Sequence, residues 1–258
     1  MHTKPLLFCL LISVSFNCKP QQDAPVRTDD AATTQSKMPE GKVAQLLSKM
    51  SDAMGGTSQW DNLEYVSWTF FGARHLVWDK KQNRVRIESP KDSSIYLVNL
   101  DELTGRYAAN GVEVTDEAAL SENLKRGKSI WINDMYWLFM PFKLTDPGVT
   151  VNYLRSDTTL TGVKADVLEL LFDNVGDTPQ NKYEIFVDQT DHLIKQWDFF
   201  KNASQATASK KWPWDNYQDY NGILLSADRS DNGGPSNVRV YEHLDDKVFT
   251  SFESFKFY

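Results

Sequence analysis

The sequence predicts an α+β protein in which antiparallel β-strands form most of the fold. From Leu63 onward, apolar and polar residues alternate with a period of two, which is typical of strands with one buried face. In residues 84–88, for example, Val85 and Ile87 alternate with three charged residues. Short turns such as Asn110-Gly111 join neighbouring strands too tightly for the helical crossovers of a parallel sheet. One helical stretch precedes this pattern and a second interrupts it.

About eleven strands are expected, and no repeat period recurs among them. Before the central helical stretch, strands are expected near residues 63–71, 76–78, 84–88, 94–100 and 105–109. After it, they are expected near residues 149–153, 167–172, 183–187, 193–200, 223–227, 238–241 and 249–255. The turn-forming residues between these segments favour hairpins, so the strands should form a meander.

Two segments have helical periodicity. In residues 40–54 one face carries apolar residues, and Gly55-Gly56 should end the helix. These apolar residues are Val43, Leu46, Leu47, Met50 and Met54, which could pack in a core or line a cavity. The second segment begins after Asp116, a good N-cap, and Gly127 predicts a break that divides it into two helices.

Residues 130–148 (IWINDMYWLFMPFKLTDPG) are the most apolar part of the second segment. An ordinary surface helix has one apolar stripe, whereas this stretch is apolar on nearly every side. It is too short for a membrane span and is interrupted by Asn133, Asp134 and Lys143. It should therefore lie in the protein's own core, or plug or line a hydrophobic cavity.

The first 39 residues should not belong to the folded domain. Residues 1–17 read as a secretion signal, with Lys4 before a short apolar run. Ser15 to Cys18 resembles the box at which bacterial lipoproteins are cleaved and lipidated, which predicts a lipid anchor on Cys18. Because residues 16 and 17 (Phe, Asn) depart from the usual small residues, a plain signal peptide or a shifted cleavage site is the alternative. Residues 18–39 then form a polar, disordered tether, and residues 40–258 a single domain.

Composition and motifs exclude several functions and reveal no chemistry. The net charge of −7 and pI near 5.2 argue against nucleic-acid binding. Both cysteines, Cys9 and Cys18, precede the expected domain, so it has no thiol for a disulfide, a metal or nucleophilic catalysis. The histidines are isolated, and phosphate-binding loops and serine-elbow motifs are absent. We therefore expect a protein that is not an enzyme and that uses no metal or cofactor.

Aromatic residues are the informative ones. The chain has 8 Trp, 10 Tyr and 14 Phe, and many share the core faces of the expected strands. A closed core favours Leu, Ile and Val, so an aromatic interior points to a lined pocket. Two alternatives stay open. The core could be solid and the protein an interaction module of the cell envelope, or aspartates in residues 212–220 (WPWDNYQDY) could hydrolyse a glycan.

The order of these features resembles the lipoprotein-carrier family, which includes LolA-like and LolB-like proteins. The resemblance covers most of residues 40–256 and rests on the first helix, the Trp-rich meander and the apolar insert with its WLFMP motif at residues 137–141. Residues 131–149 and 178–183 (TPQNKY) are more closely similar to a family of uncharacterised bacterial envelope lipoproteins. The carrier resemblance implies a curved, half-open β-barrel of about eleven strands, with helices covering its mouth and acyl chains inside.

These observations together predict an envelope lipoprotein that binds a lipid or acyl chain, in lipid or lipoprotein transport. It would be anchored in the outer membrane facing the periplasm, with an envelope protein as a further partner. The helices of residues 117–144 would form a lid, with Gly127 and Pro141 at its hinge ends. The residues expected to line the cavity are Trp68, Phe70, Trp78, Val85, Ile87, Trp131, Met135 and Leu138.

Overall fold

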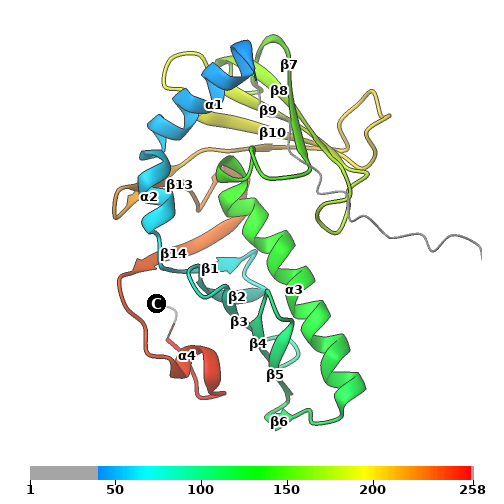
Figure 1. Cartoon of the computed structure of the whole chain (residues 1–258). Helices are drawn as coiled ribbons and strands as arrows, with labels where there is room; N and C mark the ends of the chain where they lie inside the picture. The colour runs from blue at the N-terminus through cyan, green and yellow to red at the C-terminus, as the bar shows by residue number, and fades with distance from the viewer. Residues whose placement is uncertain (1–39, 257–258) are drawn as a thin grey trace, which may run out of the picture. The chain divides into compact units, whose positions relative to one another are not determined.

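A computed structural model of the chain describes residues 40–256. The expected signal peptide, the lipidation of Cys18 and the polar tether all lie outside these residues. Within them, the fold is α+β with mostly antiparallel strands, as the sequence predicts (Figure 1).

Two short helices open the described chain. Helix α1 (Gly41–Ala53) buries Leu46 and Met50, and Met54 after it is also buried, as the expected apolar face requires. Helix α2 (Gly56–Asn62) was not expected. Gly55 joins the two helices with a φ of 104°, and a Cβ at this position would collide with the carbonyl oxygen of Gly222. Glycine is therefore required there for both its backbone angle and its size.

The first sheet has seven antiparallel strands in the order β14-β1-β2-β3-β4-β5-β6. Its first part is the expected meander, joined by tight turns. The strands are β1 (Tyr65–Phe70), β2 (Arg74–Asp79), β3 (Arg84–Ser89), β4 (Ser94–Asn99), β5 (Thr104–Ala109), β6 (Val112–Glu113) and β14 (Pro235–Tyr241). Strand β14, the last strand in chain order, pairs with β1 at the edge of the sheet.

The second sheet has five antiparallel strands in the order β11-β10-β9-β8-β7. Its strands are β7 (Val149–Thr158), β8 (Lys164–Phe172), β9 (Lys182–Asp188), β10 (Ile194–Phe200) and β11 (Lys210–Pro213). A separate hairpin consists of β12 (Tyr217–Tyr220) and β13 (Ile223–Ser226), and the short helix η2 spans Ser230–Asn232. Neither large sheet closes on itself in the described residues, so the β-structure is open, consistent with a half-open barrel.

Helix α3 (Glu117–Phe139) crosses the seven-stranded sheet, and η1 (Met140–Phe142) follows it (Figure 1). Asp116 caps it as expected, accepting a hydrogen bond from Ala119 N at 2.8 Å. The prediction that Gly127 divides this segment was wrong, because the helix is continuous through it. A Cβ at Gly127 would lie 3.0 Å from a methyl of Val98 and 3.1 Å from the Tyr96 ring. The glycine therefore permits close packing of helix on sheet.

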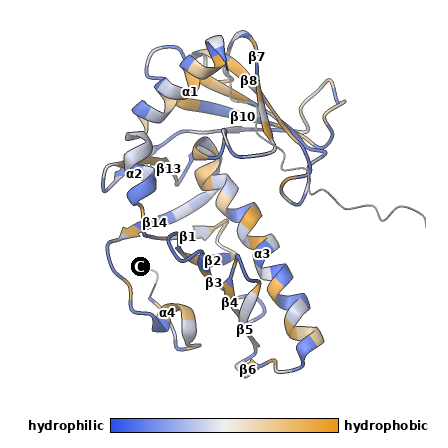
Figure 2. Ribbon diagram, viewed as in Figure 1, coloured by the Kyte–Doolittle hydropathy of each residue, from blue (hydrophilic) through white to orange (hydrophobic). Residues whose placement is uncertain are grey.

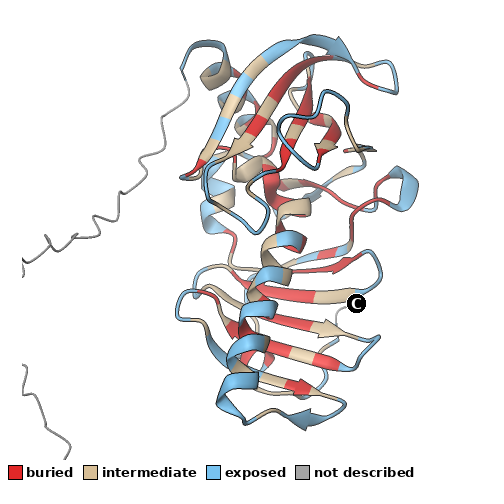
Figure 3. Ribbon diagram, turned by 90° about the vertical axis from the view of Figure 1, so that its right-hand side faces the viewer, coloured by how far each residue is buried: buried red, intermediate tan, exposed pale blue. Residues whose placement is uncertain are grey.

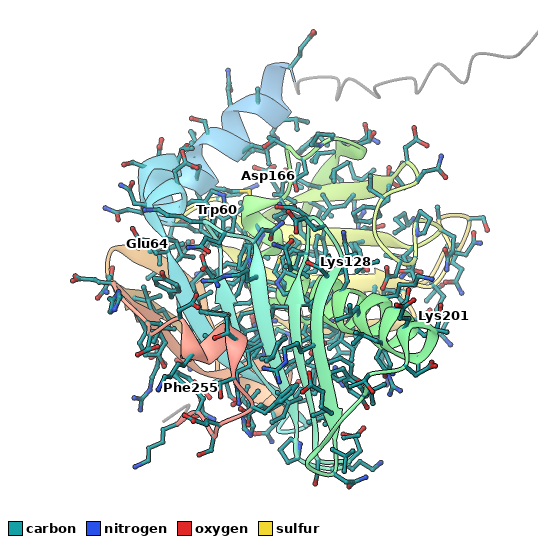
Figure 4. All side chains as sticks on the ribbon, turned by 60° about the horizontal axis from the view of Figure 1, so that its bottom comes forward. Trp60, Glu64, Lys128, Asp166, Lys201 and Phe255 are labelled. Atoms are coloured by element: carbon teal, nitrogen blue, oxygen red, sulfur yellow. The ribbon has the colours of Figure 1, made fainter. Side chains whose placement is uncertain are left out.

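The packing of α3 leaves its outer side in solvent over most of its first half (Figure 3). On the sheet side, Lys128, labelled in Figure 4, donates a hydrogen bond to the carbonyl of Leu100 at 2.6 Å. The helix is therefore held against the end of β4 by a polar contact as well as by apolar packing.

The C-terminal segment covers the other face of the seven-stranded sheet. The expected strand at 249–255 was wrong: α4 spans Lys247–Thr250, and the residues after it have no strand pairing. Arg86, which alternation places on a solvent face, is fully buried beneath this segment. Its guanidinium donates to the carbonyls of Val248, Ser251 and Glu253 at 2.7–3.1 Å. Phe255, labelled in Figure 4, is near the end of the segment.

Apolar side chains form two main clusters. One lies between α3 and the seven-stranded sheet, and the other between α1, η1 and the five-stranded sheet. Both α1 and the nearby strands carry hydrophobic stretches (Figure 2). Trp137 and Phe142 pack against both clusters, so the end of α3 and η1 connect them.

Candidate ligand cleft

A cleft of about 700 Å³ lies between the second half of α3 and the five-stranded sheet. Residues 129–137 of α3 form one side. Phe172 of β8, Tyr183 of β9 and Trp197 of β10 form the facing side. Residues 143–149 and 175–178 complete the wall, together with Arg74 at the start of β2. The volume falls within the range of small-molecule sites.

Aromatic rings make the sheet side of the cleft. Tyr183 lies 5.4 Å from Phe172 and 5.0 Å from Trp197, measured between ring centroids. From α3, Tyr136 packs 5.9 Å from Tyr183, and Trp137 meets Trp197 edge-on at 4.3 Å. These rings hold one another in place, so the wall they form is apolar and rigid.

Four of the five charged residues in the wall form ion pairs with one another, and the fifth, Asp177, accepts a hydrogen bond from Ser129. Arg74 donates two hydrogen bonds to Asp134, at 2.7 and 2.8 Å, and Asp134 is fully buried. Burial raises the pKa of the Asp134 carboxyl, and the hydrogen bonds from Arg74 oppose that shift. Lys143 forms an ion pair with Asp146 at 2.5 Å. Because these charges are engaged with one another, a ligand in the cleft would contact mainly apolar side chains.

The loop of residues 173–181 forms one rim of the cleft. Val175 packs against Gly148, whose φ is 82° and where a Cβ would collide with the valine side chain. Asp173 N donates to the Gly148 carbonyl at 2.8 Å, and Ser129 of α3 hydrogen-bonds with Asp177. The rim is therefore attached to α3 on one side and to the start of β7 on the other.

A second, smaller groove of about 430 Å³ lies between helices α1 and α2 and residues 141–146. Asp146 contributes to both clefts, so the segment after α3 separates them. Its aromatic lining is one stacked pair, Trp60 and Phe142, whose ring centroids lie 4.8 Å apart.

The eight residues predicted to line a cavity lie together, in a packed core. Seven are buried in the cluster between α3 and the seven-stranded sheet, and Trp131 packs against that cluster. Trp131 and Met135 also line the cleft; the other six do not. The six are Trp68, Phe70, Trp78, Val85, Ile87 and Leu138.

Sequence reasoning missed the sheet side of the cleft. Phe172, Tyr183 and Trp197 sit on ordinary alternating strands, and nothing local to them distinguishes a cleft wall from a core. A signal was nevertheless present in the two motifs at residues 131–149 and 178–183, because both contain cleft-lining residues. The two motifs are far apart in the chain, and the fold brings them to the same cavity.

The described residues hold no metal site or catalytic pair of carboxylates that the sequence left open. Residues 40–256 contain no group of three or more His, Cys, Asp or Glu side chains placed to hold a metal. In the 212–220 segment, Asp215 accepts a hydrogen bond from Ser230 N and Asp219 one from Gly222 N, each at 3.0 Å. Both aspartates therefore order turns, and neither lines either cleft. No helix in the same residues is long and apolar enough to cross a membrane.

No protein-family model matches the sequence, and no curated protein matches it. Three solved structures resemble the fold, at low identity. A DUF1329 family protein from Desulfovibrio piger is 12% identical with a TM-score of 0.44, over 82% of this chain and 98% of that one. An outer membrane lipoprotein-sorting protein domain from Vibrio parahaemolyticus is 12% identical with a TM-score of 0.38, over 72% and 88%. A LolA superfamily protein from Nitrosomonas europaea is 11% identical with a TM-score of 0.36, over 81% and 97%. The names of the second and third structures belong to the lipoprotein-carrier family that the sequence resembles.

Proposed function

We propose that this protein binds an apolar ligand, a lipid or an acyl chain, in the cleft between α3 and the five-stranded sheet. The observation that carries the proposal is the cleft itself: about 700 Å³, walled by aromatic and aliphatic side chains of α3 and three adjacent strands. Leaving such a surface in water is unfavourable, and burying each methylene of a chain there stabilises the complex by about 0.8 kcal/mol.

The cellular setting belongs to the same proposal. Cys18 would carry the lipid anchor, residues 18–39 would be a tether, and residues 40–258 would act as one binding domain. Anchored to the outer membrane on its periplasmic side, such a domain could reach a lipid or lipoprotein and hold its acyl chains during transport. The role is one of binding without catalysis, in which an envelope protein delivers or receives the ligand.

The test is binding of an apolar fluorophore, N-phenyl-1-naphthylamine, to the full chain carrying Cys18→Ser, which removes the acylation site. Ile132→Glu places a charge in the cleft and should weaken dye binding at least tenfold, because a carboxylate resists transfer into an apolar site. Ile132 lies outside both main core clusters, so the variant should still fold.

The matched control is Leu160→Glu, which adds the same charge at a side chain that is 70% exposed and away from the cleft. It should bind the dye as the parent protein does. Equal dye binding by the Ile132 variant and its parent would remove the cleft as the site.

An interaction module of the cell envelope is the second candidate, favoured by one observation. The interior between α3 and the seven-stranded sheet is filled by the packed cluster, as a solid-cored protein requires. Phe71, at the β1–β2 turn, is an aromatic side chain that a partner protein could contact, because it is 45% exposed. Its ring also packs edge-on against Trp137. A parent protein that takes up no dye would favour this candidate.

A further inference from the structure

Buried polar atoms without a hydrogen-bond partner concentrate around the cleft. In residues 40–256 there are six such side-chain atoms, and three belong to cleft-lining residues. These are the Tyr136 hydroxyl and the indole nitrogens of Trp131 and Trp197. Each is a hydrogen-bond donor, and a buried donor left unpaired costs free energy. The wall of an otherwise apolar cleft therefore holds donors that lack acceptors.

All three groups belong to side chains whose rings have aromatic neighbours. Trp131 packs edge-on against Trp78 at 5.3 Å, and Trp197 packs against Trp137 at 4.3 Å with the rings at 75°. An N–H directed at a ring face is a weak but real hydrogen bond. The Tyr136 ring likewise meets Phe172 edge-on, with 6.0 Å between centroids. Unlike an indole N–H, the hydroxyl proton of Tyr136 can rotate about its C–O bond to meet an acceptor.

The Tyr136 hydroxyl remains neutral at ordinary pH. Burial raises its pKa well above the usual 10.0, and the nearby Tyr183 and Asp146 raise it further. It therefore presents a proton rather than a charge. The hydroxyl is buried within the cleft wall, so a small displacement of the wall would bring it against the acceptor oxygen of a ligand.

The charges around the cleft indicate which acceptor fits. The charged lining residues are two cations, Arg74 and Lys143, and three carboxylates, Asp134, Asp146 and Asp177. Both cations are engaged by carboxylates within the wall. An anionic ligand would meet a surplus of negative charge and no free cation among these residues, whereas a neutral carbonyl would meet neither obstacle.

We propose that the Tyr136 hydroxyl donates a hydrogen bond to the ester carbonyl of a neutral acyl ester, and so selects acyl esters over plain hydrocarbons and free fatty acids. This inference rests on the proposed function and specifies its ligand class. Tyr136 is then the residue that sets specificity, while the aromatic wall supplies the affinity for the chain.

The test compares three probes of similar length, methyl dodecanoate, dodecanoate and tridecane, as competitors of the bound dye at pH 8. The protein is the full chain carrying Cys18→Ser, with and without Tyr136→Phe. Phenylalanine keeps the ring and removes only the hydroxyl. Affinity for methyl dodecanoate should fall about tenfold in this variant, while affinity for tridecane should change less than twofold.

Tyr217→Phe is the matched control. Its hydroxyl is also buried, but it donates to the carbonyl of Ile194 at 3.1 Å and lies outside the cleft. That variant should leave the affinities for all three probes unchanged.

Several results would overturn the inference. If Tyr136→Phe lowers the affinities for methyl dodecanoate and tridecane equally, or lowers neither, the hydroxyl does not hydrogen-bond to the ester carbonyl. If the variant lowers only the affinity for dodecanoate, the hydroxyl binds the carboxylate of a free fatty acid instead of an ester. A loss of stability in the ligand-free Tyr136→Phe protein would show that the hydroxyl already has a partner within the folded chain. If the parent protein binds neither dye nor probe, the proposed function fails together with the inference.

Discussion

Arg74 holds Asp134 through two parallel hydrogen bonds, from Nε to Oδ2 at 2.7 Å and from Nη2 to Oδ1 at 2.8 Å. The pair connects the start of β2 with the second half of α3. Asn133 adds a third donor to the same carboxylate, at 2.9 Å. A charged residue in the most apolar stretch of the chain is thus explained, because it fixes the helix that forms one side of the cleft.

Breaking this pair should destabilise the fold unequally, depending on which partner is removed. Arg74→Ala leaves a fully buried carboxylate unpaired and should cost about 3–5 kcal/mol of unfolding free energy. Asp134→Ala should cost less, because the Arg74 side chain is 27% exposed and can be hydrated. Urea denaturation of both variants measures the difference. A larger loss for Asp134→Ala would contradict this account of the pair.

Gly127 should tolerate no side chain, although it lies within a helix. Gly127→Ala gains about 1 kcal/mol of helix propensity, but its Cβ meets Val98 and Tyr96, both buried and unable to move far. Gly127→Val should therefore cost about 1–3 kcal/mol, and Gly127→Ala should give no net gain. Ala119→Val, on an exposed position of the same helix, is the control and should cost a few tenths of a kcal/mol. If the glycine were instead a hinge, the valine variant would alter ligand exchange and leave stability unchanged.

Arg86 should hold the C-terminal segment on the sheet. Arg86→Ala removes three hydrogen bonds to carbonyls in residues 248–253 and should free that segment. Trypsin cleavage after Lys247 should then become at least tenfold faster under native conditions. Arg106→Ala is the comparison: that side chain is 44% exposed, donates to one carbonyl of the segment, that of Thr250, and lies over the Phe252 ring, so its loss should accelerate cleavage less. Identical digestion of the parent and both variants would show that Arg86 does not hold the segment.

Stability should decline in alkali through buried tyrosines. Burial raises the pKa of Tyr136 and of Tyr217 above the usual 10.0. Above pH 10 the unfolded chain loses these phenolic protons while the native chain keeps them, so the unfolded state binds fewer protons and stability falls as pH rises. Either Tyr→Phe variant should flatten that decline, measured as unfolding free energy at pH 7 and pH 10.5. At pH 7 only Tyr217→Phe should lose stability, about 1 kcal/mol, because its hydroxyl has a partner.

The sequence predicted the local structure well where one residue pattern determines it. Alternation and turn chemistry located the meander, and the apolar face of residues 40–54 located α1. The errors came from elements whose structure depends on distant packing. Residues 249–255 (FTSFESF) carry aromatic residues that suggested a closing strand, yet the segment begins in α4 and then crosses the sheet, where its carbonyls accept hydrogen bonds from Arg86. Gly127 looks like a helix break until its contacts with β4 are known.

The candidate site was harder to predict than the fold, for a specific physical reason. Alternation reveals which face of a strand is apolar, but not whether a helix, a second sheet or a ligand covers it. Trp68 and Trp78 therefore gave the same signal as Tyr183 and Trp197, although the first two lie in a packed core and the others face the cleft. Only the relative placement of α3 and the two sheets separates these cases.

The central claim is that the cleft holds an apolar ligand. Native mass spectrometry of the full chain carrying Cys18→Ser, isolated from cells, tests it most directly. The same protein is then extracted with organic solvent to release the ligand. We expect an added mass on the intact protein and recovery of an acyl ester from the extract, both lost in Ile132→Glu and retained in Leu160→Glu. A protein with no added mass, which also takes up no added methyl dodecanoate, would contradict the claim.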